Sequence, residues 1–313
     1  MSEVAAKQDS ARYLDPAVIA RIQRLDLRTR LIVEGFISGL HRSPYQGFSV
    51  EFAQHREYVP GDDVRHIDWK VFARSDRYYI KQYEEETNLR CVFLVDVSES
   101  MKYGGTRLTK YDYAASITAS LALLLLRQQD AVGLCTFDED LRTVLPPSAR
   151  TGHINSIVHV LEEDSRRLLA KTSLEHICHK VAEKLDHRGM VCIVSDLLED
   201  EDGLLRGLRR LVHRGHDVMV LHVMDASELT FPFQGNTRFR GMEASGDLIA
   251  EPRSLREGYL ASLQRYLEKV KRGCISNRVS YRLASTEENL GAVLGAFLSY
   301  RIEVGRKASS KHR

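Results

Sequence analysis

The stretch Cys91-Val-Phe-Leu-Val-Asp96-Val-Ser98-Glu-Ser100-Met101 decides the fold of this chain. Its opening run, residues 91–95, is entirely apolar. A strand that is covered by helices on both faces needs such an unbroken run, because neither of its faces meets water. Small polar side chains follow at once between Asp96 and Ser100. The stretch therefore predicts a buried parallel strand that ends in a polar loop.

Apolar runs and helical patterns alternate along the rest of the chain. Further strands are predicted at residues 131–137, 190–194, 217–223 and 279–283. Apolar residues at helical spacing predict helices at 110–128, 154–163, 173–185, 202–214, 255–271 and 287–300. Hairpins are predicted where 131–137 meets 141–145 and where 239–244 meets 248–250. Strands that alternate with helices predict an α/β fold, with an open, mostly parallel sheet and helices on both of its faces.

The first 90 residues follow other patterns. Apolar positions at helical spacing predict one or two helices between Pro16 and Gly39. Short aromatic-rich stretches, such as 48–52 and 78–83, alternate as strands do, and glycine and proline separate them. We therefore expect a small β-rich module before the sheet. The predicted division is 1–40 for an N-terminal tail and helices, 41–88 for this module, 89–302 for the sheet domain and 303–313 for a basic tail.

The composition limits the class of protein. The 313 residues carry a net charge of +2, so no strong overall field draws the chain to nucleic acid, although its last third is basic. The N-terminus is polar, unlike a signal peptide, and the longest apolar stretch, 114–126, is too short to cross a bilayer. The 5 cysteines are odd in number and form no C-x-x-C pair, which favours a reducing compartment over disulfides. We expect a cytoplasmic protein with no transmembrane segment and no nucleic-acid partner.

Residues that offer oxygen atoms follow two of the predicted strands. Asp96, Ser98 and Ser100 follow the first strand, Asp196 follows the strand at 190–194, and Thr172 stands just before a helix. Ligands of open parallel sheets bind at the carboxyl ends of the strands. Two carboxylates and three hydroxyls suit a hard cation, so Mg²⁺ is predicted, with Mn²⁺ and Ca²⁺ as the alternatives. These donors leave one position for an Asp or Glu side chain of a protein partner.

The same residues, in the same order, resemble the metal-ion-dependent adhesion site of von Willebrand factor A-like (vWA) domains. The resemblance is strongest over residues 89–225. It implies a Rossmann-like fold, a divalent metal bound by the serines and the threonine, and a partner carboxylate that completes the metal's shell. Two departures accompany it: Ala170-Lys171 stands where that family has two glycines, and Ser195-Asp196-Leu197 replaces Thr-Asp-Gly. A lysine beside a cation repels it, so the first departure bears most on Thr172.

A second motif lies upstream. Arg56-Glu-Tyr-Val-Pro-Gly-Asp-Asp-Val-Arg-His-Ile-Asp-Trp69, followed by Ala73-Arg74, resembles the signature of the bacterial family called domain of unknown function 58. This resemblance extends through the Asp96 loop. It implies an adaptor or chaperone-like role beside a MoxR-type AAA+ ATPase, because members of that family are commonly encoded next to such ATPases. The alternating acidic and basic residues of the motif are also typical of an ion-pair network that holds a module together.

Two alternatives stay open beside a metal-dependent interaction protein. One is a metal-free structural scaffold, in which Asp96 and the two serines only satisfy loop amides or cap the helix that follows. The other is a metal-dependent hydrolase that uses Asp96 and Asp196, although a dehalogenase-type phosphatase needs a second Asp where Ser98 stands. The sequence contains no P-loop, Gly-x-Ser-x-Gly or His-Glu-x-x-His motif, which argues against an enzyme. His176, Cys178 and His179 do not share one helix face, which argues against zinc.

Overall fold

The computed structural model describes residues 14–40, 55–57, 78–81, 89–104, 108–164, 173–235, 237–240 and 247–310. The chain divides into two units, one of residues 1–39 with 88–313 and one of residues 40–87. In the smaller unit, strands β1 (His55–Glu57) and β2 (Tyr79–Lys81) pair antiparallel. These two strands lie within the range 41–88 predicted for the β-rich module, and most of that range lies outside the described residues. The strand predicted at 48–52 and residues 58–74 of the upstream motif lie outside the described residues.

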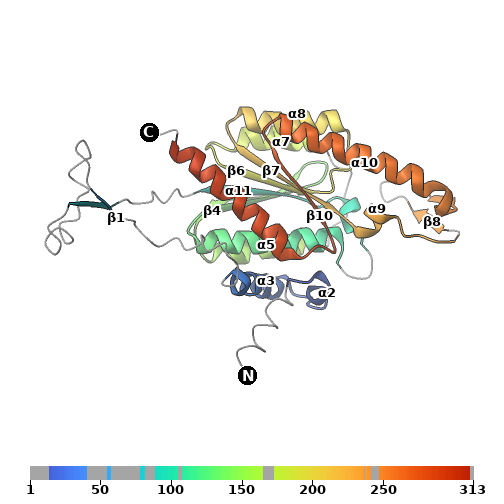
Figure 1. The fold of residues 1–313 in the computed structure, drawn as a ribbon, viewed down its shortest axis with the longest axis horizontal. Coiled ribbons are helices and arrows are strands. Elements are labelled where there is room, and N and C mark those ends of the chain that lie inside the picture. The colour runs from blue at the N-terminus through green and yellow to red at the C-terminus, as the bar shows by residue number, and fades with distance from the viewer. Residues whose placement is uncertain are drawn as a thin grey trace, which may run out of the picture. The chain divides into compact units, whose positions relative to one another are not determined.

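A six-stranded sheet forms the centre of the larger unit (Figure 1). Its strands are β3 (Arg90–Asp96), β4 (Ala131–Phe137), β5 (Leu141–Ser148), β6 (Met190–Ser195), β7 (Asp217–Met224) and β10 (Ser280–Ser285). Their order is β10-β7-β6-β3-β4-β5, and neighbours are parallel except β4 and β5. β5 is an edge strand and contains two prolines. Proline cannot donate a backbone hydrogen bond, so it is tolerated at an edge, where only one side of the strand is paired. The mostly parallel sheet and the first predicted hairpin are therefore confirmed.

Helices cover both faces of this sheet (Figure 1). One face carries α7 (Leu174–Lys184), α8 (Glu201–His213) and α10 (Pro252–Ser276), and the other carries α5 (Lys110–Arg127) and α11 (Leu290–Ser310), with α6 (His153–Asp164) beside α5. Successive residues of β3 point to opposite faces. Leu94 packs in the cluster with α7 and α8, whereas Phe93 stacks on Phe297 of α11 with ring centroids 5.9 Å apart. The apolar run at 91–95 is thus buried on both sides, as predicted.

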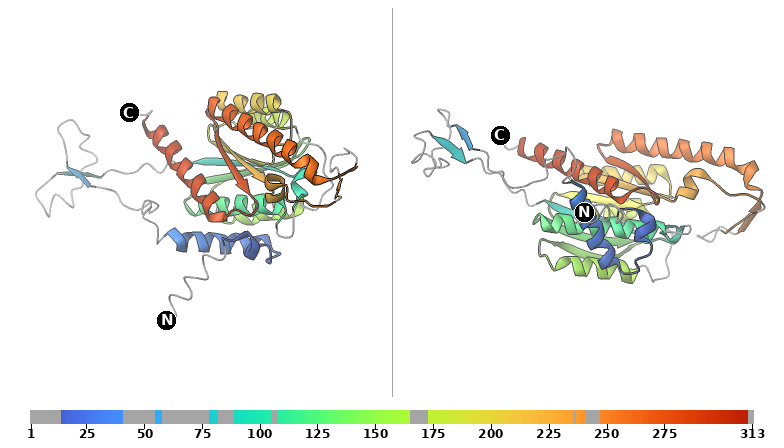
Figure 2. Two further views of the ribbon diagram at one scale, coloured as in Figure 1. Left: turned by 45° about the vertical axis from the view of Figure 1, so that its right-hand side comes forward. Right: turned by 60° about the horizontal axis from the view of Figure 1, so that its bottom comes forward.

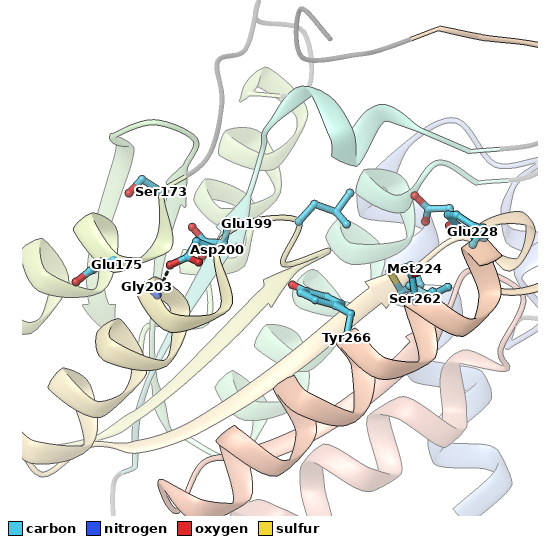
Figure 3. A pocket seen from close by; sticks show the side chains of 12 residues that line it. Ser173, Glu175, Glu199, Asp200, Gly203, Met224, Glu228, Ser262 and Tyr266 are labelled. Atoms are coloured by element: carbon cyan, nitrogen blue, oxygen red, sulfur yellow. Dashed lines mark hydrogen bonds between the residues drawn. The ribbon is translucent and has the colours of Figure 1, made fainter. Parts of the chain in front are cut away.

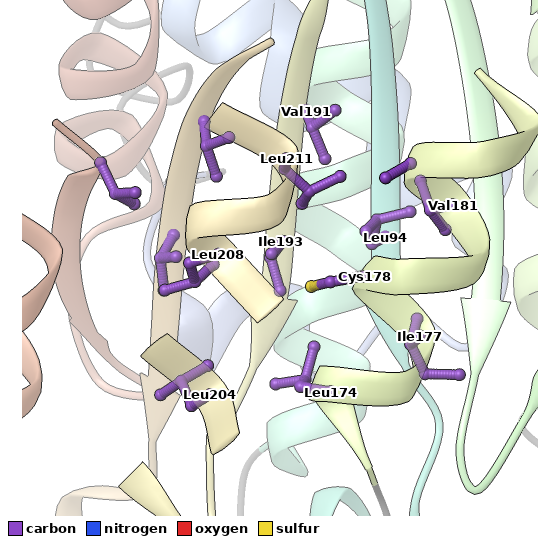
Figure 4. Packing of buried hydrophobic residues seen from close by; sticks show 14 of the residues in the cluster. Leu94, Leu174, Ile177, Cys178, Val181, Val191, Ile193, Leu204, Leu208 and Leu211 are labelled. Carbon is purple, nitrogen blue, oxygen red and sulfur yellow. The ribbon is translucent and has the colours of Figure 1, made fainter. Parts of the chain in front are cut away.

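The core between α7, α8 and the sheet is shown in Figure 4. Leu174, Ile177, Cys178 and Val181 of α7 face the sheet there, near Ile193 of β6. The two histidines of α7, at positions 176 and 179, are exposed while Cys178 is fully buried, which confirms that the three do not share a face. All the cysteines of the chain are buried and free.

The N-terminal helices α2 (Pro16–Ile19) and α3 (Leu25–Leu40) belong to the same unit as the sheet. α3 covers the side of α5 that faces away from the sheet, in Figure 1 and in both views of Figure 2. The backbone N–H of Leu25 donates to the Glu162 side chain at 3.1 Å, and Arg28 pairs with Asp112 of α5 at 3.4 Å. α5 therefore lies between two layers, which explains its burial on nearly all sides. In the described part of the chain, no helix is both long and apolar enough to cross a membrane.

Short elements complete the larger unit. The second predicted hairpin is formed by β8 (Thr237–Arg240) and β9 (Asp247–Ala250). The 3-10 helix η2 (Glu99–Lys102) and helix α9 (Ala226–Thr230) follow β3 and β7, and neither was predicted. Both are too short for an apolar periodicity to show in the sequence.

Candidate metal site and adjoining cavity

The loop after β3 brings three of the predicted ligands together. Asp96 ends the strand, and Ser98 and Ser100 lie at the start of η2. The backbone N–H of Ser98 donates to Asp96 Oδ1 at 2.8 Å, and the hydroxyl oxygens of Ser98 and Ser100 are 3.0 Å apart. From the end of β6, the hydroxyl of Ser195 donates to Asp96 Oδ2 at 2.6 Å. One carboxylate and two hydroxyls thus meet at the carboxyl edge of the sheet, and all are buried.

Asp196 lies at the end of the neighbouring strand and is held by a lysine. Lys110 Nζ is 2.8 Å from Asp196 Oδ2 and 2.8 Å from Glu228 Oε1, and it lies 5.7 Å from the centre of the Tyr103 ring. The Lys110 side chain has no exposed surface. Asp196 is therefore part of a buried ion-pair group with Lys110 and Glu228.

Lys110 was not among the functional residues predicted from the sequence. It is the first residue of α5, and its two partners lie 86 and 118 positions further along the chain. One signal was available: Lys110 precedes Tyr113 and Ile117 at helical spacing, on a face that is otherwise apolar. A lysine on such a face needs a buried acidic partner.

Burial and mutual charge set the protonation of these groups. Burial is the main cause that raises the pKa of Asp96 to about 7, and the negative charge of Asp196 raises it further. For Lys110, burial acts to lower the pKa, but the attraction of Asp196 and Glu228 outweighs it, so the pKa is raised. Lys110 therefore stays an ammonium ion and offsets part of the negative charge of its partners.

The Asp96 loop fits a hard cation, because all its side-chain donors are oxygen atoms. The described residues contain no group of three or more His, Cys, Asp or Glu side chains that could hold a metal, so any cation here depends on the serine hydroxyls. In Asp196, Oδ2 accepts a hydrogen bond from Lys110, whereas Oδ1 receives a weak contact of 3.4 Å from the Leu198 N–H. Oδ1 is therefore the oxygen of Asp196 that is suited to a cation. The fifth predicted ligand, Thr172, and the neighbouring Lys171 lie outside the described residues.

A cavity of about 910 Å³ adjoins this group (Figure 3). Its walls come from the loop after β6 and the start of α8, from the start of α7, from the end of β7 and α9, and from α10. Leu197 in the first of these walls has a left-handed backbone with φ of 53°, and its carbonyl accepts from the Tyr266 hydroxyl of α10. The next residue, Leu198, is left 46% exposed at the cavity. Glu228 lines the cavity and also pairs with Lys110, so the two sites are adjacent.

Comparison with known proteins points to one family. The family model described as "Protein of unknown function DUF58" matches residues 54–268. An uncharacterized protein of Mycobacterium tuberculosis is 27% identical over 233 residues, which cover 74% of this chain and 72% of that protein. Among solved structures, the conserved hypothetical protein BatB from Bacteroides thetaiotaomicron is 18% identical over 70% of this chain and 99% of its own, with a TM-score of 0.49. The SpRpn10 VWA domain is 14% identical over 66% of this chain and 93% of its own, with a TM-score of 0.33.

Proposed function

The chain belongs to the family of proteins of unknown function DUF58, and on that basis we propose that it is a metal-dependent protein-interaction module, not an enzyme. In this proposal Asp96, Ser98 and Ser100 hold a Mg²⁺ ion, Thr172 and Asp196 complete the set, and Mn²⁺ or Ca²⁺ are the alternatives. One position stays open for an Asp or Glu side chain of a protein partner, and the bound cation supplies the attraction for that carboxylate. The meeting of one carboxylate and two hydroxyls after β3 supports the proposal.

The residues around Asp96 orient it for this role. Its two carboxylate oxygens accept from the Ser98 N–H and from the Ser195 hydroxyl, which come from two neighbouring strand ends. Lys110 holds the Asp196 carboxylate in the same way. Ligands that are fixed before the cation arrives lose little conformational freedom on binding, which favours affinity. The chain's own contribution is therefore to position these oxygen atoms at a buried strand end.

The proposed partner is a MoxR-type AAA+ ATPase, and the proposed compartment is the cytoplasm. The family resemblance supports the first, and the free, buried cysteines agree with the second. The ATPase performs the work of ATP hydrolysis, while this chain recognises the ring or its client through the metal. Binding of the purified ATPase should then require Mg²⁺, be abolished by EDTA and be lost in Asp96→Asn. Binding that persists undiminished under both conditions contradicts a metal-mediated contact.

A metal-free scaffold is the second candidate, and Lys110 is the observation that favours it. Its ammonium ion already offsets the charge of Asp196, so a cation is less needed there. A metal-dependent hydrolase has less support, because Ser98 occupies the place where a dehalogenase-type phosphatase needs its general acid. Hydrolysis of p-nitrophenyl phosphate that disappears in Asp96→Asn is the result that favours the hydrolase.

The first experiment is isothermal titration calorimetry of the metal-stripped protein with Mg²⁺ and Mn²⁺. Asp96→Asn removes the charge but keeps an oxygen for the Ser98 N–H, so its fold should persist. Asp140→Asn is the matched control, because Asp140 is an exposed carboxylate in the turn between β4 and β5, paired among the described residues only with the surface residue Lys180. We expect one cation per chain for wild type and Asp140→Asn, and none for Asp96→Asn. Absence of binding to folded wild-type protein contradicts the metal site and places the scaffold first.

A further inference from the structure

The cavity between α10 and the loop after β6 carries an excess of negative charge. Four carboxylates line it, from Glu175, Glu199, Asp200 and Glu228. Arg206 pairs with Glu175 at 2.7 Å and Lys110 with Glu228 at 2.8 Å. Neither Glu199 nor Asp200 forms an ion pair within the described residues, and no described lysine or arginine lines the cavity. These two carboxylates thus form no direct ion pair with a described side chain, and of the two only Asp200 feels nearby cations, from Arg206 and Lys269.

Glu199 is the more deeply held of these two. Its Oε2 accepts from the Leu174 N–H at 2.8 Å, whereas its Oε1 is buried and has no hydrogen-bond donor among the described residues. Burial is the main cause that raises the pKa of Glu199 to about 7, and nearby acidic groups add to it. A buried carboxylate oxygen without a donor is unfavourable. A donor that carries positive charge and enters from the cavity removes that penalty.

Two tyrosines of α10 line the same cavity. Tyr266 extends from α10 toward the loop that carries Glu199 and Asp200 (Figure 3), and its hydroxyl donates to the Leu197 carbonyl. The Tyr259 ring packs against Phe231 with centroids 4.7 Å apart. Both rings are therefore held in place before a ligand arrives. The face of a tyrosine ring attracts cations, and a planar guanidinium group stacks on it.

We infer that this cavity binds an arginine side chain of a protein partner. A guanidinium group pairs with a carboxylate through two parallel hydrogen bonds and also stacks on a tyrosine, which the ammonium group of lysine cannot do. Met224 and Leu263 offer apolar surface to the hydrocarbon stem of the arginine. The volume of about 910 Å³ exceeds one side chain, so the neighbouring residues of the partner's segment also fit. The carboxylates repel phosphate and other anions, which excludes nucleic acid.

The arginine site goes beyond the proposed metal-dependent function and does not require it. None of the four predicted metal ligands that the structure describes, Asp96, Ser98, Ser100 and Asp196, lines the cavity. A partner that presents an acidic residue to the metal and an arginine to the cavity would engage both, but each contact can be measured alone. The test of the arginine site is therefore made on metal-free protein in EDTA.

The experiment follows the ¹³C-labelled methyl groups of Leu198, Met224 and Leu263 by NMR while acetyl-arginine amide is added. Acetyl-citrulline amide is the matched control, because it has nearly the same shape without the charge. We expect saturable shifts with the arginine probe, none with citrulline, and affinity for acetyl-lysine amide that is weaker by about threefold or more. Unchanged methyl signals with the arginine probe, or equal shifts with citrulline, overturn the inference.

Variants locate the binding. Glu199→Gln keeps the acceptor for the Leu174 N–H and removes the charge, so it should weaken the arginine probe by about fivefold or more. Tyr259→Leu keeps an apolar contact with Phe231 and should weaken it as well, which provides a second variant if Glu199→Gln does not fold. Glu257→Gln, at an exposed position of α10 outside the cavity, should bind as wild type does. Wild-type affinity in both cavity variants overturns the inference.

Discussion

Replacing Lys110 by methionine removes a buried positive charge while keeping the length of the side chain. Asp196, whose side chain is 2% exposed, and Glu228, which is 17% exposed, then lose the ammonium ion that lies 2.8 Å from each. Removing one partner of a buried ion pair costs about 3–5 kcal/mol, because the remaining charge has no compensation. We expect Lys110→Met to lower the free energy of unfolding by that amount.

Urea denaturation followed by far-UV circular dichroism measures this loss. For a chain of this size the free energy falls by about 3 kcal/mol per molar urea, so the midpoint should drop by about 1–1.7 M. Urea is preferred to guanidinium chloride because it is uncharged and does not screen ion pairs. Arg206→Met serves as the control, since its ion pair with Glu175 is half exposed and screened by water, so its loss should move the urea midpoint far less.

A triple variant tests the origin of the loss. Lys110→Met combined with Asp196→Asn and Glu228→Gln leaves no buried charge in the group, so it should be more stable than Lys110→Met alone by about 1 kcal/mol or more. A loss below about 1 kcal/mol for Lys110→Met, or a triple variant that is less stable than the single one, refutes the assignment of a buried ion-pair group.

Two further predictions concern other buried groups. Ellman's reagent should label no cysteine of the native protein and all of them in urea, because all are buried. Burial also raises the pKa of the Cys178 thiol above its ordinary range, which lowers its reactivity further. Labelling of Cys178 in the native protein would contradict the packing of α7. Arg301→Ala removes the partner of Asp130, which is 2% exposed, and should lower the free energy of unfolding by about 2 kcal/mol. The control Arg272→Ala, at an 83% exposed position, should change it by less than about 0.5 kcal/mol. Similar urea midpoints for the two variants would contradict the role of the Arg301–Asp130 pair.

Local patterns were sufficient to predict the sheet and most of the helices. The run at 91–95 indicated a strand buried on both faces, and Leu94 and Phe93 do pack on opposite layers. This works because burial of an entire strand requires apolar side chains at every position, and that requirement is visible in consecutive residues. The short elements η2 and α9 could not be predicted, since a helix of one or two turns has no periodicity to detect.

The bounds of the last helices also depended on their surroundings. α10 begins at Pro252, three residues before the predicted start, and α11 extends to Ser310, ten residues beyond the predicted end. The start of α10 did carry a signal, since Pro252 stands at the first helical position, where proline is favoured; the end of α11 carried none. Element boundaries are less determined by local pattern than the existence of the element, because tertiary contacts decide how far a helix continues.

By itself the sequence determined that Asp96, Ser98 and Ser100 follow one buried strand and that Asp196 follows another. Parallel strands end at the same edge of a sheet, so an oxygen-rich site there could be predicted. Only the tertiary structure decided that Lys110 pairs with both Asp196 and Glu228, and that an acidic cavity with two fixed tyrosines lies beside them. The physical reason is that ion pairs depend on the distance between side chains, and partners that lie 86 and 118 residues apart in the chain leave no local pattern.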